Sequence, residues 1–127
     1  MLHGNTTDQI LKAFYKVYNS LGYGFLEKVY ENALLIELTA SGLQVVQQYP
    51  IQVFYEKQSV GEYFADIIVN DLIILELKAA ESLRDEHAAQ LTNYLKATRK
   101  EVGLLLNFGV KPEFKRLVFT NSFQKSA

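Results

Sequence analysis

Residues 63–78 read YFADIIVNDLIILELK, two apolar segments rich in β-branched side chains on either side of Asn70-Asp71. Such a pattern predicts two antiparallel strands joined by a tight turn. Three ionisable residues, Asp66, Glu76 and Lys78, interrupt the apolar segments. Because side chains alternate along a strand, Glu76 and Lys78 share one face. Burial of such charges costs several kcal/mol per ion unless they are paired or bind a metal, so the pattern indicates a functional site.

The turn between the two strands decides whether Asp66 joins the other charged side chains. A plain two-residue loop at Asn70-Asp71 would pair Asp66 with Leu75 and turn its carboxylate away from Glu76. A loop of three residues, or one β-bulge, would instead place Asp66 directly across from Glu76. We therefore predict one of these two irregularities in the hairpin.

Two carboxylates in that register would lie about 5 Å apart and repel each other by roughly 3 kcal/mol at an effective dielectric constant of about 20. A divalent cation would relieve this repulsion, polarise a phosphoryl oxygen and lower the pKa of a bound water. Lys78 would stabilise the hydroxide or the charge that develops on phosphorus. Together, Asp66, Glu76 and Lys78 predict hydrolysis of a phosphodiester bond.

The rest of the chain predicts further helices and strands around this hairpin. Apolar residues recur at helical spacing in three segments, and alternating or continuous apolar runs mark the strands. Residues 5–8 (NTTD) offer side chains that could cap the first helix. We expect helices near residues 10–21, 25–41 and 85–99, and strands near residues 45–55, 62–69, 72–79, 102–108 and 117–119. This order, ααβββαβ with a short terminal strand, predicts an α/β sandwich in which helices flank a mixed sheet.

The composition narrows the kinds of site that this chain can hold. A length of 127 residues with 49% hydrophobic content suits one domain, which we expect to span residues 1–127. The absence of cysteine and the presence of only two histidines argue against zinc sites and cysteine nucleophiles, which leaves cations held by oxygen ligands, such as Mg²⁺, Mn²⁺ or Ca²⁺. The net charge of −1 indicates that any contact with nucleic acid is local. Since the chain shows neither a signal-peptide pattern nor an apolar run of about 18 residues, we expect a cytoplasmic protein that does not contact the membrane.

Two motifs in the sequence resemble a known group of nucleases. Asp66, nine intervening residues and then Glu76-x-Lys78 resemble the catalytic signature of the PD-(D/E)XK nuclease superfamily. Residues 24–30 (GFLEKVY) have the pattern G-x-x-E-x-x-Y and are similar to the GxxExxY protein family, a small single-domain branch of that superfamily. The similarity continues through ELKA at residues 76–79, HAAQLTNYLK at residues 87–96 and GLLLNFG at residues 103–109.

This resemblance implies a restriction-endonuclease-like fold and a Mg²⁺-dependent nuclease, with Mn²⁺ as a substitute and DNA favoured over RNA as the substrate. By the resemblance, Glu27 would join Asp66 and Glu76 as a metal ligand. Gln90 and Tyr94 resemble a Q-x-x-x-Y element, which implies a catalytic role for Gln90 and a substrate contact for Tyr94. Many relatives carry a basic residue just ahead of the aspartate, where this chain has Phe64-Ala65. That departure bears on how substrate is held rather than on metal binding.

Several alternatives stay open at the level of sequence. His87 precedes Gln90 by three residues, so it is either a phosphate contact or proton shuttle on the same helix face, or a surface histidine at the start of a helix. The chain is either a nuclease or a non-catalytic module that keeps the fold and binds nucleic acid or a protein. By analogy with the fold, a homodimer that reaches both strands of a duplex is a further expectation.

Overall fold

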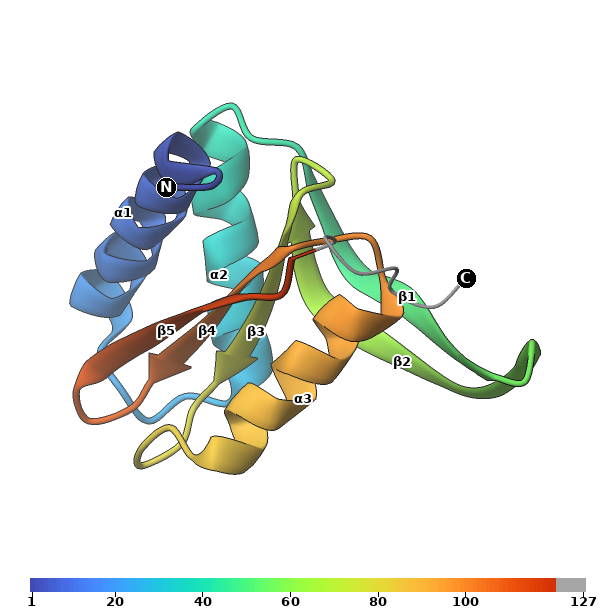
Figure 1. Cartoon of the computed structure of the whole chain (residues 1–127). Helices are drawn as coiled ribbons and strands as arrows, with labels where there is room; N and C mark the ends of the chain where they lie inside the picture. Colours follow the sequence, from blue (N-terminus) through green and yellow to red (C-terminus); the bar gives the residue numbers. More distant parts are fainter. Residues whose placement is uncertain (121–127) are drawn as a thin grey trace.

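The computed structural model describes residues 1–120, which form three helices and five strands in the predicted order (Figure 1). The elements are α1 (Gly4–Leu21), α2 (Glu27–Ala40), β1 (Val45–Tyr55), β2 (Gln58–Val69), β3 (Ile73–Lys78), α3 (Asp85–Ala97), β4 (Val102–Phe108) and β5 (Pro112–Val118). The expectation for residues 121–127, as part of the same domain, lies outside the described residues.

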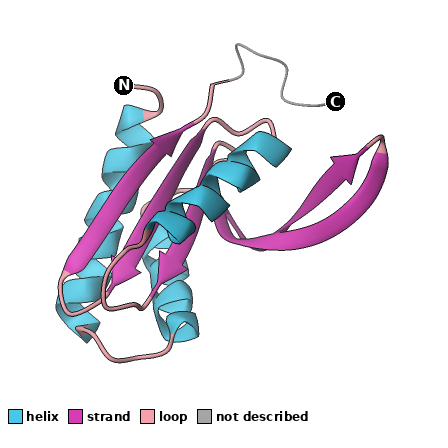
Figure 2. Ribbon diagram, turned by 60° about the horizontal axis from the view of Figure 1, so that its bottom comes forward, coloured by secondary structure: helices cyan, strands magenta, loops and turns pink. Residues whose placement is uncertain are grey.

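The five described strands form one mixed sheet in the order β1-β2-β3-β4-β5. Neighbouring strands are antiparallel except β3 and β4, which are parallel and are connected through α3. Helices α1 and α2 cover one face of the sheet, and α3 covers the other (Figures 1 and 2). This arrangement confirms the predicted α/β sandwich with a mixed sheet.

Strands β3 and β4 lie at the centre of the sheet and are buried on both faces. Every residue of β4 is buried, as its nearly continuous apolar sequence predicts. In β3, Ile73, Leu75 and Leu77 pack into the core beneath α1 and α2, whereas Ile74 packs into the core beneath α3. By the alternation of side chains, Glu76 therefore faces the α3 side of the sheet.

The β1–β2 hairpin projects well beyond the other strands (Figures 1 and 2). Its two strands are joined by Glu56 and Lys57, both with positive φ (50° and 63°), as a type I′ turn requires. The inner half of the hairpin is part of the core through residues such as Ile51, Ala65 and Ile68. The outer half extends past α3 (Figure 2).

A buried tyrosine holds the start of α2 against the rest of the fold. The Tyr30 hydroxyl donates to the carbonyl of Gly22 (2.7 Å) and accepts the backbone N–H of Phe25 (3.2 Å). Its ring stacks on Phe108 of β4 with centroids 4.3 Å apart. The tyrosine of the G-x-x-E-x-x-Y pattern therefore has a structural role, and Gly24 (φ 110°) supplies the left-handed backbone that the connecting loop needs.

Three boundaries differ from their predicted positions. Strand β2 begins at Gln58 rather than near residue 62, because the tight turn at Glu56 and Lys57 pairs Gln58 directly with Tyr55. Helix α1 begins at Gly4 rather than after the polar residues 5–8, because the His3 carbonyl already accepts the N–H of Thr7 (2.9 Å). Strand β5 begins at Pro112 and pairs with the whole of β4 rather than covering residues 117–119 alone. Proline and charged side chains obscured it in the sequence, yet they are typical of an edge strand, where Pro112 occupies the first position. Among residues 1–120, no helix has both the length and the apolar character needed to cross a membrane.

Candidate active site

The hairpin between β2 and β3 has a three-residue loop, which is one of the two irregularities that the sequence predicted. Val69 pairs with Ile73, so residues 70–72 form the loop. The same register continued by three residues places Asp66 opposite Glu76. The two carboxylates therefore start from one face of the sheet, which confirms the predicted register.

Local side-chain chemistry fixes this loop. Asn70 and Asp71 both adopt left-handed backbone conformations (φ 53° and 56°), which Asn and Asp tolerate better than most residues. The Asn70 side chain accepts the N–H of Gln44, and Asp71 forms an ion pair with Lys100 (2.7 Å). These contacts tie the loop to β1 and to the segment after α3, so they hold the register that aligns the carboxylates.

The carboxylates of Asp66 and Glu76 each accept a hydrogen bond from a backbone N–H of the neighbouring strand. The N–H of Asp66 donates to Glu76 Oε2 (2.9 Å), and the N–H of Leu77 donates to Asp66 Oδ2 (2.8 Å). The pair is thus locked in position before any ligand arrives, as a preorganised site requires.

Burial gives this pair unusual acid–base behaviour. Desolvation, followed by the charge of Asp66, raises the pKa of Glu76 to about 8. Desolvation also raises the pKa of Asp66, although the hydrogen bond from Leu77 opposes the rise. The Lys78 ammonium lowers both pKa values but does not cancel the effect of burial. Near neutral pH the pair therefore shares a proton.

Helix α3 brings two more polar side chains close to the Asp66–Glu76 pair. The Gln90 amide donates to the Tyr94 hydroxyl (2.8 Å). Burial raises the pKa of Tyr94, and the negative charges of Glu76 and Asp66 raise it further, so its hydroxyl lies within electrostatic range of both carboxylates. The structure thus brings together five of the residues singled out in the sequence: Asp66, Glu76, Lys78, Gln90 and Tyr94.

The donor set suits a hard divalent cation. No three acidic or histidine side chains cluster tightly enough within residues 1–120 to enclose a cation. Mg²⁺ does not need such a cage, because it usually retains several waters and is held by one or two carboxylates together with substrate phosphates. Asp66 and Glu76, adjacent and mutually repulsive when ionised, fit that mode of binding.

The family model that describes the PD-(D/E)XK nuclease superfamily matches residues 4–117. The chain belongs to the PD-(D/E)XK nuclease superfamily. Its fold is also similar to the crystal structure of SSO0001, with a TM-score of 0.57 and 17% sequence identity over 73% of this chain. This chain spans 50% of the length of that protein, and at this identity the likeness concerns the fold alone. A comparison with curated proteins finds no match.

The superfamily match leaves open which acidic residue of α2 serves the site. Glu27 is exposed at the first position of α2. Glu31, one helical turn later, is buried, and its charge raises the pKa of Asp66. Sequence reasoning singled out Glu27 through the G-x-x-E-x-x-Y pattern and missed Glu31. The burial of an acidic residue one turn after another could not be read from that pattern, because Glu27 and Glu31 lie on the same side of a helix.

Two neighbouring glutamines hold Glu31 in place. Its carboxylate accepts hydrogen bonds from the side chains of Gln47 and Gln48 on β1, and from Lys28 (3.2 Å). Gln48 has a left-handed backbone (φ 54°), so two consecutive side chains of one strand reach the same acceptor. The pairs on either side, Gln47 with Ile67 and Tyr49 with Ala65, place Gln48 level with Asp66. The charge of Glu31 acts on that carboxylate.

The side-chain amide of Asn107 fixes the chain just after Lys78, at the end of β3. The sequence analysis assigned no role to this residue. Asn107 is fully buried, accepts the N–H of Ala80 (2.9 Å) and donates to the Ala80 carbonyl (3.0 Å). The signal was present in the sequence, because Asn107 is the one polar side chain in an otherwise apolar strand. Such a residue normally needs a specific partner when it is buried.

His87 lies at the start of α3, and its imidazole forms a hydrogen bond with the backbone. Its Nδ1 accepts the N–H of Arg84 (3.1 Å), so the imidazole satisfies a free backbone group at the helix terminus. This contact supports the structural alternative stated above for His87. A substrate contact through its other nitrogen stays a prediction.

Proposed function

We propose that this protein is a Mg²⁺-dependent nuclease that hydrolyses phosphodiester bonds of nucleic acid. The observation that carries the proposal is the locked Asp66–Glu76 pair, which faces α3 and lies close to Lys78. Membership in the PD-(D/E)XK superfamily makes nucleic acid the class of substrate to test. The motif at residues 24–30 further leads us to place the chain in the GxxExxY branch.

In this proposal Asp66 and Glu76 hold the cation, with Glu31 or Glu27 supplying further negative charge from α2. When bound, the cation supplies polarisation of a phosphoryl oxygen and acidification of a water molecule. The Lys78 ammonium stabilises the negative charge that develops during attack on phosphorus. Gln90 orients the Tyr94 hydroxyl beside the carboxylates, where both groups can position the substrate. Mn²⁺ is expected to replace Mg²⁺, because both prefer oxygen ligands.

Incubation of the purified protein with single- and double-stranded DNA and RNA, in Mg²⁺, Mn²⁺ or EDTA, tests the proposal. We expect cleavage with either cation, none in EDTA, and faster cleavage of DNA than of RNA. Lys78→Ala should lower the rate by at least about 100-fold, in line with the loss of one group that stabilises transition-state charge. Lys16→Ala serves as the matched control, because Lys16 is exposed on α1 and pairs with Glu37 (3.1 Å).

Inactivity of the wild type under every condition, or equal rates for wild type and Lys78→Ala, would count against a nuclease. Binding of nucleic acid without cleavage would then favour the non-catalytic module. The homodimer expected by analogy is tested separately by light scattering after size-exclusion chromatography.

A further inference from the structure

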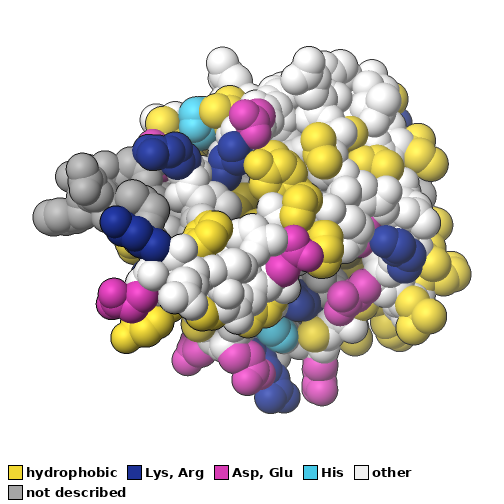
Figure 3. All heavy atoms as spheres, turned by 90° about the vertical axis from the view of Figure 1, so that its right-hand side faces the viewer, with side chains coloured by type: hydrophobic (Ala, Val, Ile, Leu, Met, Phe, Trp, Pro, Cys, Tyr) yellow, Lys and Arg dark blue, Asp and Glu magenta, His cyan; other side chains and the backbone are white. Residues whose placement is uncertain are grey.

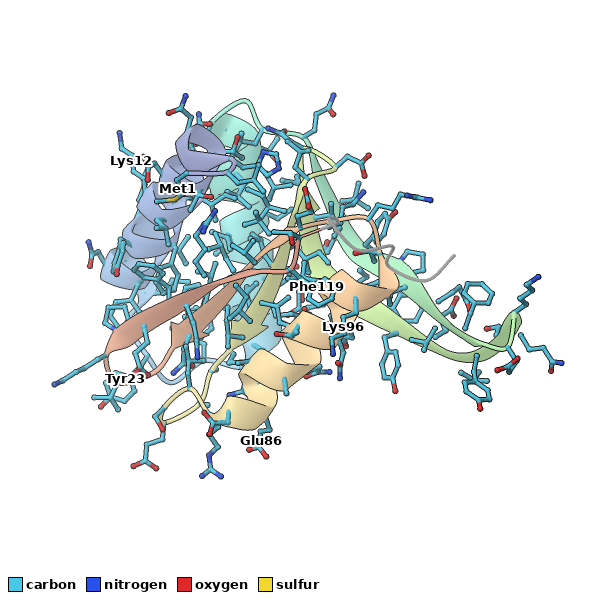
Figure 4. All side chains as sticks on the ribbon, viewed as in Figure 1. Met1, Lys12, Tyr23, Glu86, Lys96 and Phe119 are labelled. Carbon is cyan, nitrogen blue, oxygen red and sulfur yellow. The ribbon has the colours of Figure 1, made fainter. Side chains whose placement is uncertain are left out.

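A cavity of about 610 Å³ lies between the outer half of the β1–β2 hairpin and α3. Its volume is within the range of about 300–1,000 Å³ that is typical of small-molecule sites. The hairpin lines it with Gln52, Phe54 and Tyr63, and α3 lines it with Gln90, Asn93 and Tyr94. Figure 4 shows ring side chains along the outer hairpin, and Figure 3 shows hydrophobic side chains spread over this side of the molecule.

This cavity shares two residues with the candidate active site. Gln90 and Tyr94 line the cavity and also form the hydrogen-bonded pair beside Asp66 and Glu76. The ring of Tyr63 lies against that of Tyr94, with centroids 5.7 Å apart. A ligand in the cavity would therefore lie next to a phosphodiester held at the paired carboxylates.

The lining of the cavity suits a nucleobase rather than a phosphate. Glu86 and Lys96 supply one charge of each sign and lie toward opposite ends of α3 (Figure 4), so the lining carries no net positive charge. Gln52 and Asn93 instead offer amide groups, which both donate and accept hydrogen bonds as base edges do. Half-exposed aromatic rings such as Tyr63 (49% exposed) offer flat surfaces on which a base can stack.

We propose that this cavity binds an unpaired nucleobase next to the scissile phosphodiester, so that the protein selects single-stranded or frayed nucleic acid over intact duplex. The inference rests on the proposed nuclease function for the position of the scissile bond. Bases inside a duplex are paired and stacked, and they cannot enter a protein cavity without leaving the helix. The occupant is a nucleotide of the substrate itself.

The test measures binding in EDTA, where cleavage is absent, by fluorescence anisotropy of a short fluorescein-labelled oligothymidylate. A labelled abasic strand of the same length carries the same phosphates and no bases. We expect the wild type to bind oligothymidylate at least about tenfold more tightly than the abasic strand or a duplex, as stacking of one base predicts. Tyr63→Ala should weaken binding of oligothymidylate about tenfold and leave binding of the abasic strand unchanged.

Phe64→Ala is the matched control, because Phe64 is the next residue of β2, is equally exposed (50%) and lies outside the cavity lining. It should bind both strands as the wild type does. Tyr63→Phe keeps the ring and should restore binding, whereas Asn93→Ala removes an amide from the opposite wall and should weaken binding of oligothymidylate alone. Thermal unfolding of each variant verifies that it is folded.

Three results would overturn the inference: equal binding of oligothymidylate and the abasic strand by the wild type, wild-type binding by folded Tyr63→Ala, or an equal loss in Phe64→Ala. The nuclease proposal fails separately. If the predicted binding pattern is seen but Mg²⁺ gives no cleavage, the cavity binds bases in a protein that is not a nuclease. If cleavage is seen but bases add nothing to binding, the cavity inference alone is wrong.

Discussion

At the scale of single residues, the raised pKa of Glu76 links the candidate site to the stability of the metal-free protein. The folded protein holds a proton on Glu76 up to about pH 8, whereas a solvated glutamate loses it near 4.5. The folded state thus binds the proton more tightly than the unfolded state. This contribution to stability is fully present below about pH 4.5 and is lost as the pH rises toward 8.

We therefore expect the free energy of unfolding in EDTA to fall between about pH 5 and pH 8.5. Denaturant titrations at a series of pH values would measure it. Glu76→Gln cannot ionise and should flatten most of this dependence. If the wild type is equally stable across the range, or if Glu76→Gln keeps the same slope, the carboxyl pair does not share a proton as described.

The two acidic residues of α2 form a natural pair for a second experiment. Glu31 is buried and acts electrostatically on Asp66, whereas Glu27 is exposed. The Glu31→Gln substitution removes a negative charge near the proposed cation. It keeps an oxygen that can accept hydrogen bonds from Gln47 and Gln48. We expect Glu31→Gln to lower the affinity of the protein for Mn²⁺ several-fold, which is roughly 1 kcal/mol in binding free energy. Glu27→Gln should change this affinity by less.

Calorimetric titration of Mn²⁺ into each variant would compare their affinities for the cation. A larger loss in Glu27→Gln than in Glu31→Gln would support the metal-ligand role that the family resemblance implies for Glu27. Either outcome identifies the acidic residue of α2 that the site uses.

At the scale of elements, one glycine controls the end of the strand that carries Lys78. A Cβ added at Gly109 would lie 2.4 Å from the carbonyl oxygen of Ala80 and 3.0 Å from Nδ2 of Asn107. The backbone after β3 would have to move, together with the amide contacts that position it.

Gly109→Ala is therefore expected to destabilise the protein by about 1–3 kcal/mol and to lower nuclease activity as Lys78 shifts. Gly4→Ala, at the start of α1, is the control, because its added Cβ would meet Cβ of Met1 at an ordinary 3.6 Å. Chemical denaturation together with the cleavage assay would verify both. Unchanged stability in Gly109→Ala would mean that the Ala80 carbonyl is not confined as the structure indicates.

The elements also show where sequence reasoning succeeds and where it stops. The demand that Asp66 and Glu76 share a face predicted an irregular hairpin, with either a three-residue loop or a β-bulge, because a strand has a strict two-residue periodicity. The structure has the three-residue loop. No comparable constraint identified Glu31 or the left-handed Gln48, since both depend on how α2 packs against β1. Strand β5 was underestimated because the polar sequence of an edge strand resembles a loop.

At the scale of the whole molecule, the proposed function requires a nearly neutral chain to recognise nucleic acid without a general excess of basic residues. The net charge is −1, and the cavity beside the candidate site carries charges of both signs. Affinity that depends on stacking and amide contacts is less sensitive to salt than affinity that depends on phosphate contacts. This arrangement agrees with the absence of a basic residue just ahead of Asp66, where Phe64-Ala65 occur.

The architecture supports the site from both faces of the sheet. The core beneath α1 and α2 holds β3 rigidly through Leu75 and Leu77, while the opposite face presents Glu76 toward α3. The projecting hairpin and α3 then form the two walls of the adjacent cavity. The proposed chemistry on the central strands and the proposed base recognition on the hairpin should therefore be separable by mutation.

Calorimetric titration of Mg²⁺ and Mn²⁺ into the metal-free protein at pH 7, in buffers of different ionisation enthalpy, tests the central claim most directly. The account predicts binding at one site with release of up to about one proton, because the cation must displace the proton held on Glu76. Asp66→Asn with Glu76→Gln should abolish that binding while the protein stays folded. Absence of binding by the wild type, or equal binding by the double variant, would contradict a cation site at the paired carboxylates.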